Sequence, residues 1–308
     1  MGMTFNPGTR LDTSQVSKRG GGGGRGGGLG GPGIKIGGGL GGLVIMVIMA
    51  LVFGPEVLTG QQGFNDTSQI EQQSAGEDLA TKCRTGEDAN ADVECRVVGT
   101  VNSLNAYWQQ GTYDLGVAYR APSAVLTSGQ WQTACGVGSS SMGPFYCSGD
   151  ETAYFDVAFF AQLRERFGAE QGPLPEEYVV AHEWGHHIQY LTGDLQRTRD
   201  GQTGPQSNAV RLELQADCYA GVWAANAAVT PDPATGEPYL QPLTTEDISD
   251  ALSAAEAIGD DAIMETSGGR VIPENFTHGS SEQRMTWFLR GYRDGRPTAC
   301  DTFAVDRV

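Results

Sequence analysis

Residues 181–187 read AHEWGHH and hold three of the chain's four histidines. The stretch contains H-E-x-x-H, the pattern of zinc peptidases. On a helix, His182 and His186 lie on one face, where two imidazoles can reach one metal ion. Glu183 follows the first histidine directly, where a carboxylate can act as general base on a metal-bound water. The stretch therefore predicts a helix that carries a catalytic Zn²⁺ site.

A third ligand is expected, because a catalytic zinc site usually takes three protein ligands and keeps one position for water. The predicted helix over residues 208–228 carries two acids one turn apart, Glu213 and Asp217, among apolar residues. We expect Glu213 to be the third ligand, since a buried carboxylate otherwise lacks a charge partner. Asp217 can accept the free ring N–H of His182, which would fix the tautomer of that ligand. The alternative is that both acids are solvated.

Two other residues of the motif have separate readings. His187 lies on the flank shared with Glu183, so a packing role beside the site is favoured over ligation. Gly185 costs on the order of 1 kcal/mol in a helix interior, which predicts that another helix approaches closely there. The competing reading of the histidine pair, hydrogen-bonded core histidines, leaves Glu183 unexplained.

The fourth histidine stands in THGSSEQR at residues 277–284, where a helix over residues 281–294 is predicted to begin. His278 or Arg284 could enter the cleft and donate hydrogen bonds to a tetrahedral oxyanion, which makes His278 a candidate catalytic residue. Equally, His278 could be an ordinary loop residue and Arg284 an ion-pair partner for Asp217 or another acid. Both readings stay open.

Four motifs resemble, in order, those of the bacterial neutral zinc metallopeptidase family, the YpfJ-like proteins. They are GPFYCSGDETAYFD at 143–156, AHEWGHHIQ at 181–189, ELQADCYAGVW at 213–223 and THGSSEQR at 277–284. The E-x-x-A-D and T-H-x-S-x-x-x-R patterns are also similar to those of HtpX-type membrane proteases, of the gluzincin class. Those proteases have several membrane spans, whereas one is predicted here.

The resemblance implies a zincin-like metallopeptidase with one catalytic Zn²⁺, ligands His182, His186 and Glu213, and Glu183 as catalyst. By analogy with the class, an extended peptide would add to the edge of a small sheet, near residues 154–156. Two other functions fit the same residues. One is a non-catalytic, zinc-stabilised adaptor or chaperone module of the cell envelope, and the other is a zinc hydrolase of non-peptide amides.

The predicted fold is α+β, helix-rich with a small sheet, over residues 79–308. Short strands are expected at residues 124–126, 133–135 and 154–156. Helices are expected at residues 156–167, from Pro175 to Gly193, and at 208–228, 246–258 and 281–294.

The first part of the chain is predicted to lie apart from this domain. Residues 1–36 are expected to form a disordered, basic, glycine-rich cytoplasmic tail. Residues 37–54 contain no charge and predict one transmembrane helix, with a signal peptide or a buried helix as alternatives. Residues 55–78 would be a linker. Basic residues precede the span, so we expect a single-pass cell-membrane protein with its catalytic domain outside the cytoplasm.

The net charge of the domain disfavours one class of binding partner, nucleic acid. The chain has a net charge of -17, with five basic and one acidic side chain before residue 55, so the remainder carries about -21. Such a domain repels phosphate backbones, which disfavours nucleic acid. The expected substrate, a protein or peptide, is instead what the resemblance to the metallopeptidases implies.

The even number of cysteines, six, predicts disulfides in an extracytoplasmic domain. Six cysteines allow fifteen pairings. Proximity in sequence favours two local pairs and leaves one long-range pair: Cys83–Cys95, Cys135–Cys147 and Cys218–Cys300.

Overall fold

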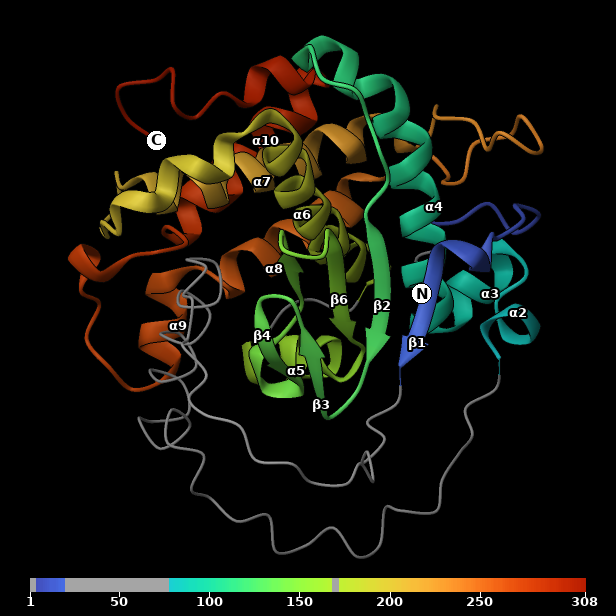
Figure 1. Ribbon diagram of the computed structural model, residues 1–308, viewed down its shortest axis with the longest axis horizontal. Coiled ribbons are helices and arrows are strands. Elements are labelled where there is room, and N and C mark those ends of the chain that lie inside the picture. Colours follow the sequence, from blue (N-terminus) through green and yellow to red (C-terminus); the bar gives the residue numbers. More distant parts are fainter. Residues whose placement is uncertain (1–3, 20–77, 168–171) are drawn as a thin grey trace, which may run out of the picture.

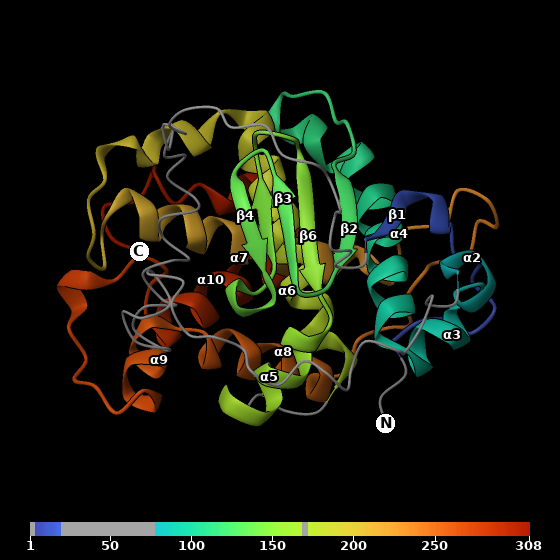
Figure 2. The ribbon, with the colours of Figure 1, turned by 60° about the horizontal axis from the view of Figure 1, so that its bottom comes forward.

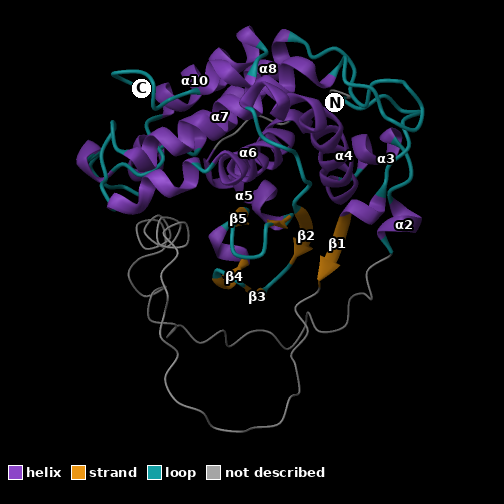
Figure 3. Cartoon of the chain, turned by 45° about the horizontal axis from the view of Figure 1, so that its top comes forward, coloured by secondary structure: helices purple, strands orange, loops and turns teal. Residues whose placement is uncertain are grey.

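The computed structural model of the protein describes residues 4–19, 78–167 and 172–308 (Figure 1). Its helices gather into one body, and the strands lie along one side of that body (Figure 3). The helix-rich α+β class predicted from the sequence is confirmed.

The main sheet has four strands in the order β1-β2-β6-β5. Its strands are β1 (Val16–Arg19), β2 (Ser123–Thr127), β6 (Thr152–Asp156) and β5 (Phe145–Cys147). The first three are parallel, and β5 runs antiparallel to β6. The placement of residues 154–156 at a sheet edge is therefore wrong for Tyr154, because β6 lies between β2 and β5 and β5 pairs with residues 152–154. The edge strands of this sheet are β1 and β5.

A separate hairpin covers one face of the sheet (Figure 2). It consists of β3 (Gln130–Thr133) and β4 (Gly136–Ser139), and the helices lie behind the sheet in this view. Trp131 of the hairpin stacks on Phe145 and Tyr154 of the sheet. These rings form a small second core with Val125 and Cys147.

Among the described residues, α-helices occur at all five positions expected from the sequence, and four further α-helices accompany them. The α-helices are α2 (Leu79–Lys82), α3 (Gly86–Ala91), α4 (Val93–Gly111), α5 (Ala158–Phe167), α6 (Pro173–Thr192), α7 (Asn208–Ala227), α8 (Thr245–Ala257), α9 (Asp260–Thr266) and α10 (Ser281–Asp294). Short 3-10 helices span Thr13–Gln15, Thr112–Leu115, Ser140–Met142, Asp194–Asp200, Pro273–Asn275 and Pro297–Cys300. Helix α6 ends at Gly193, whose φ of 86° suits glycine, and Ser207 caps α7 through the N–H of Val210.

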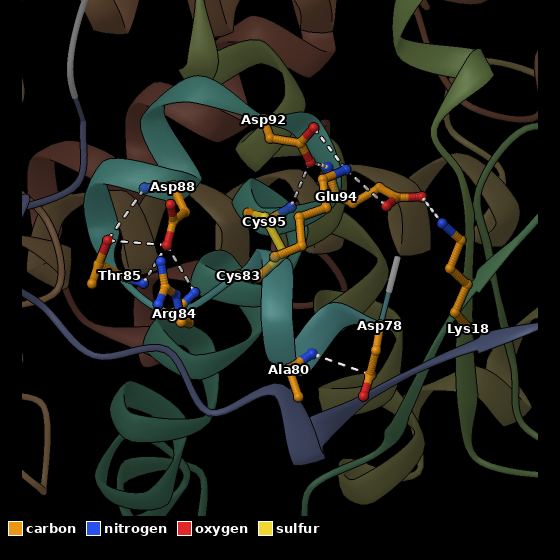
Figure 4. The surroundings of a disulfide bond; sticks show 11 residues. Lys18, Asp78, Ala80, Cys83, Arg84, Thr85, Asp88, Asp92, Glu94 and Cys95 are labelled. Carbon is orange, nitrogen blue, oxygen red and sulfur yellow. Dashed lines mark hydrogen bonds and ion pairs between the residues drawn. A yellow bond between two sulfur atoms is a disulfide. The ribbon is translucent and has the colours of Figure 1, made fainter. Parts of the chain in front are cut away.

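Residues 4–19 belong to the folded domain. Phe5 is completely buried in the main core, and β1 pairs with β2. Asp12 and Asn102 exchange two hydrogen bonds, and Lys18 forms an ion pair with Glu94 (Figure 4). The expectation of a disordered tail over residues 1–36 is therefore wrong for residues 4–19. Sequence reasoning missed this segment because its partners lie far away along the chain.

The predicted membrane span at 37–54 and the linker up to residue 77 lie outside the described residues. Within the described parts of the chain, no helix is both long and apolar enough to cross a membrane. The pairing of β1 with β2 puts residues 19 and 78 in one folded unit. A single crossing between them would put these two parts on opposite sides of a membrane, so a cytoplasmic tail with the catalytic domain outside is incompatible with this pairing.

All three predicted disulfides are present, and no cysteine is free. Cys83–Cys95 joins α4 to the segment that follows α2 (Figure 4). Asp92 lies near these sulfur atoms, but the disulfide removes the thiolates that would bind a metal ion there. Cys218–Cys300 ties the C-terminal segment to α7.

Candidate metal centre

The crossing of α6 and α7 creates the site. A Cβ added to Gly185 would lie 2.8 Å from the Cα of Ala216, so only glycine allows this approach. The close helix contact expected at Gly185 is confirmed. It brings His182 and His186, one turn apart on α6, against Glu213 of α7.

The three candidate ligands offer atoms that all lie within 4.8 Å of one another. His182 Nε2 is 3.2 Å from one oxygen of Glu213, and His186 Nε2 is 3.6 Å from the other. The two imidazole rings are nearly perpendicular. One carboxylate therefore faces both rings.

Asp217 is hydrogen-bonded to His182 at Nδ1, the ring nitrogen that does not face Glu213. Its side chain is fully buried, and Oδ1 lies 2.8 Å from His182 Nδ1. The same carboxylate accepts hydrogen bonds from the Tyr178 hydroxyl and from two nitrogens of Arg284. Burial opposes ionisation, but Arg284 and His182 lower the pKa of Asp217 to about 2. Asp217 is thus a carboxylate, and the Nδ1–H of His182 donates to it.

The free nitrogens of the histidines suit a cation. His186 Nδ1 is 2.8 Å from the side-chain oxygen of Gln189, so both rings use Nδ1–H for hydrogen bonds and direct Nε2 towards Glu213. The histidines hold the pKa of Glu213 well below its usual range despite burial. Lone pairs and a carboxylate would repel one another without a positive charge between them. A donor set of two imidazoles and one carboxylate is typical of catalytic Zn²⁺ sites.

A proton can supply that positive charge in the metal-free chain. Burial alone lowers the pKa of His182, but Asp217 and Glu213 raise it to about 10.

Neither Asp217 nor Glu213 is a solvated surface acid. The side chain of Asp217 has no exposed surface, and that of Glu213 is 13% exposed. The reading of both as solvated surface acids is therefore wrong.

Glu183 lies beside this group and is 7% exposed. Burial raises its pKa, and the nearby histidines and a hydrogen bond from the backbone N–H of Tyr146 oppose the rise. Tyr146 belongs to the edge strand β5, so the edge of the sheet is joined directly to the candidate general base. This link was not apparent from the sequence.

His187 is outside the donor set. Its Nε2–H donates to the carbonyl of Arg120, and its Nδ1 accepts from the Tyr146 hydroxyl. Burial lowers the pKa of His187 to about 4, which keeps the ring neutral. The ring makes edge contacts with Tyr119 and Tyr146, and both of its nitrogens are occupied.

His278 and Arg284 have different environments. Burial lowers the pKa of His278, but Glu213 and Asp260 reverse this effect and raise it, so His278 neighbours the donor set without being part of it. Its Nδ1 is 2.9 Å from the hydroxyl of Thr277. Arg284 is buried, and its guanidinium contacts Asp217, Tyr178 and the carbonyl of Ile258. Of the two readings of Arg284, the structure places it as the ion-pair partner of Asp217.

Sequence reasoning missed two residues that contact this group, Tyr178 and Gln189. Their spacing was a usable signal. Tyr178 precedes His182 by one turn, and Gln189 follows His186 by three residues, so both lie near the ligand face of α6. Asp260, which accepts three backbone N–H groups around His278, gave no comparable signal.

The chain has relatives among known proteins. Residues 8–303 match the model of the family described as "Putative neutral zinc metallopeptidase". The uncharacterized protein Rv2575 of Mycobacterium tuberculosis is 50% identical over 257 residues, which cover 83% of this chain and 85% of that protein. The uncharacterized protein YpfJ of Escherichia coli is 37% identical over 283 residues, covering 89% and 91%. No solved structure matches the chain.

Proposed function

The chain belongs to the neutral zinc metallopeptidase family, and on this premise we propose that it is a zinc-dependent endopeptidase. His182, His186 and Glu213 would bind one catalytic Zn²⁺, and Glu183 would act as the general base. The observation that carries the proposal is the convergence of two imidazoles and a buried carboxylate next to a second, unligated carboxylate.

The chemistry divides between the metal and the protein. A bound Zn²⁺ lowers the pKa of a water towards neutrality and polarises a carbonyl. Glu183 takes the proton of the attacking water and later delivers it to the leaving nitrogen. Its burial supports this double role, because a carboxyl with a raised pKa can accept and return a proton near neutral pH. His278 is the candidate donor to the oxyanion, because it lies close enough to Glu213 for their charges to interact.

An extended peptide would bind along β5 (Phe145–Cys147). Among the described strands, β5 pairs on one side only, with β6. The backbone N–H of Tyr146 lies near enough to Glu183 to lower its pKa, so β5 passes beside the candidate site. A peptide that adds as a strand here would pass its backbone by Glu183. This supports peptide bonds as the substrate class.

We also propose that the domain functions outside the cytoplasm. Three disulfides support this location, because disulfides persist in oxidising compartments. The pairing of β1 with β2 supports the same location for residues 4–19. Attachment to the membrane through residues 37–54 stays a prediction, but a single crossing there is incompatible with residues 4–19 and the domain lying on one side.

The proposal can be tested in cells. Protein termini are compared by mass spectrometry between cells expressing wild type and cells expressing Glu183→Gln, with the exposed Glu256→Gln as matched control. New termini are expected in wild type and in the control, and absent in Glu183→Gln. Identical termini in all three strains, with Glu183→Gln restoring a deletion strain fully, would instead support the non-catalytic adaptor.

A further inference from the structure

We propose that Gln189 is a positioning residue of the metal centre, which fixes the tautomer of His186 and ties α6 to α7 beside Glu213. The inference rests on the proposed binding of Zn²⁺. Gln189 is fully buried, and its amide has hydrogen-bonding partners on both sides. It lies on α6, three residues after the second histidine.

The partners of the amide determine its orientation. Gln189 Nε2 is 2.5 Å from the carbonyl oxygen of Leu212 and 3.0 Å from the side-chain oxygen of Gln215. A backbone carbonyl can only accept a hydrogen bond, so the amide nitrogen must face Leu212. The amide oxygen then faces His186, as observed.

This orientation fixes the proton on the histidine. The amide oxygen of Gln189 can only accept, so His186 Nδ1 must carry the hydrogen. In the neutral imidazole, Nε2 then has the free lone pair, and this atom lies 3.6 Å from Glu213. A carbonyl on α7 therefore determines, through one amide, which nitrogen of His186 can bind a metal ion.

The same side chain connects two ligands. It contacts His186 directly, and it holds the carbonyl of Leu212, the residue immediately before Glu213. Gln215 extends the contact towards Asp194, which lies beyond the end of α6. Loss of the Gln189 amide would free the His186 ring to rotate and would remove a link between the helices next to the third ligand.

An amide suits this position better than a carboxylate. His182 is backed by Asp217, whose charge is balanced by Arg284. Among the described residues, no arginine or lysine contacts the side chain of Gln189. A glutamate there could still accept from His186, but it could not donate to the carbonyl of Leu212.

The test measures Zn²⁺ affinity of the full chain by competition with a chromophoric chelator. Gln189→Met removes both halves of the interaction at similar side-chain size. Gln215→Met is the matched control, because it removes a buried glutamine amide of the same network that touches no ligand. Loss of such an outer contact typically weakens metal binding by about 10- to 100-fold. We expect this loss in Gln189→Met and wild-type affinity in Gln215→Met, with similar thermal stability of the two metal-free variants.

Gln189→Glu keeps the inference testable if Gln189→Met does not fold. It retains the acceptor for His186 and loses the donor to Leu212, so weakened Zn²⁺ binding is expected again. Wild-type affinity in either folded variant, or an equal loss in Gln215→Met, would overturn the positioning role. A wild-type chain that binds no Zn²⁺ would instead overturn the proposed function, so the two failures are distinguishable.

Discussion

Gly185 and Ala216 touch where α6 crosses α7, with room for no side chain on the glycine. Gly185 stands between the two histidines of the motif, and Ala216 stands between Glu213 and Asp217. The separation of the helices at this point therefore sets how closely the carboxylates approach the imidazoles. Replacement of Gly185 should affect metal binding as well as packing.

Gly185→Ala should weaken Zn²⁺ binding and lower the melting temperature. Alanine favours a helix by about 1 kcal/mol over glycine. Its methyl group, however, would collide with the α7 backbone, and overpacking of this kind typically costs about 1–3 kcal/mol. Thermal unfolding and chelator competition measure both effects. Gly8→Ala is the control, since a Cβ there meets nothing. Unchanged Zn²⁺ affinity in Gly185→Ala would show that the crossing does not position Glu213.

Asp217→Asn should be strongly destabilising, because it leaves the buried guanidinium of Arg284 without its anion. Removing one partner of a buried ion pair typically costs about 3–5 kcal/mol. Urea unfolding measures this loss. In the double variant Asp217→Asn/Arg284→Met, stability should partly return while Zn²⁺ affinity stays low, since His182 still lacks a carboxylate acceptor. Full recovery of affinity in the double variant would contradict the role given to Asp217.

Glu177 makes stability depend on pH. Burial raises its pKa to about 7 from the ordinary value of 4.5, although Thr4 and Arg96 oppose the rise. Between these values the unfolded chain has lost the proton that the folded chain retains, so stability falls as pH rises through this window and then levels. Glu177→Gln should remove this fall, which is on the order of 3 kcal/mol. Urea unfolding between pH 4.5 and pH 8 measures the free energy of unfolding of both proteins. If this free energy changes with pH in the same way in Glu177→Gln and wild type, Glu177 is not the cause of the pH dependence.

Phe5→Ala should destabilise the domain, because Phe5 fills a core position against Gly99 of α4. Truncation of a buried phenylalanine typically costs about 3–5 kcal/mol. Ser17→Ala, at an exposed position of the same segment, is the control. Thermal unfolding compares them. Equal melting temperatures for Phe5→Ala and wild type would mean that residues 4–19 do not pack on the domain in solution.

The features that could be predicted from the sequence depend on residues that lie close together along the chain or on the regular spacing of a helix. The ends of α6 and α7 followed from Gly193 and Ser207, and the meeting of His182, His186 and Glu213 followed from one turn of helix and a returning helix. Gly185 indicated the close crossing, because glycine is unfavourable inside a helix unless another helix approaches too closely for a side chain. The Cys83–Cys95 and Cys135–Cys147 pairs followed from proximity along the chain.

What the sequence did not predict depends on distant pairing. The parallel partner of β1 lies more than a hundred residues away, and no local pattern indicates such a register. The central position of β6 depends on β5 and β2 together, so residues 154–156 alone could not reveal it. The role of Gln189 depends on the carbonyl of Leu212, a group that every residue has and that a motif cannot mark.

The most direct test of the zinc peptidase assignment is cleavage of a denatured protein by the purified, Zn²⁺-loaded full chain, with zinc content measured on the same samples. Wild type should contain one Zn²⁺ and cleave, and a chelator should stop cleavage until Zn²⁺ is restored. Glu183→Gln should keep its zinc and lose at least about a hundredfold in rate, the scale of general base catalysis. Full cleavage by zinc-loaded Glu183→Gln would contradict the account.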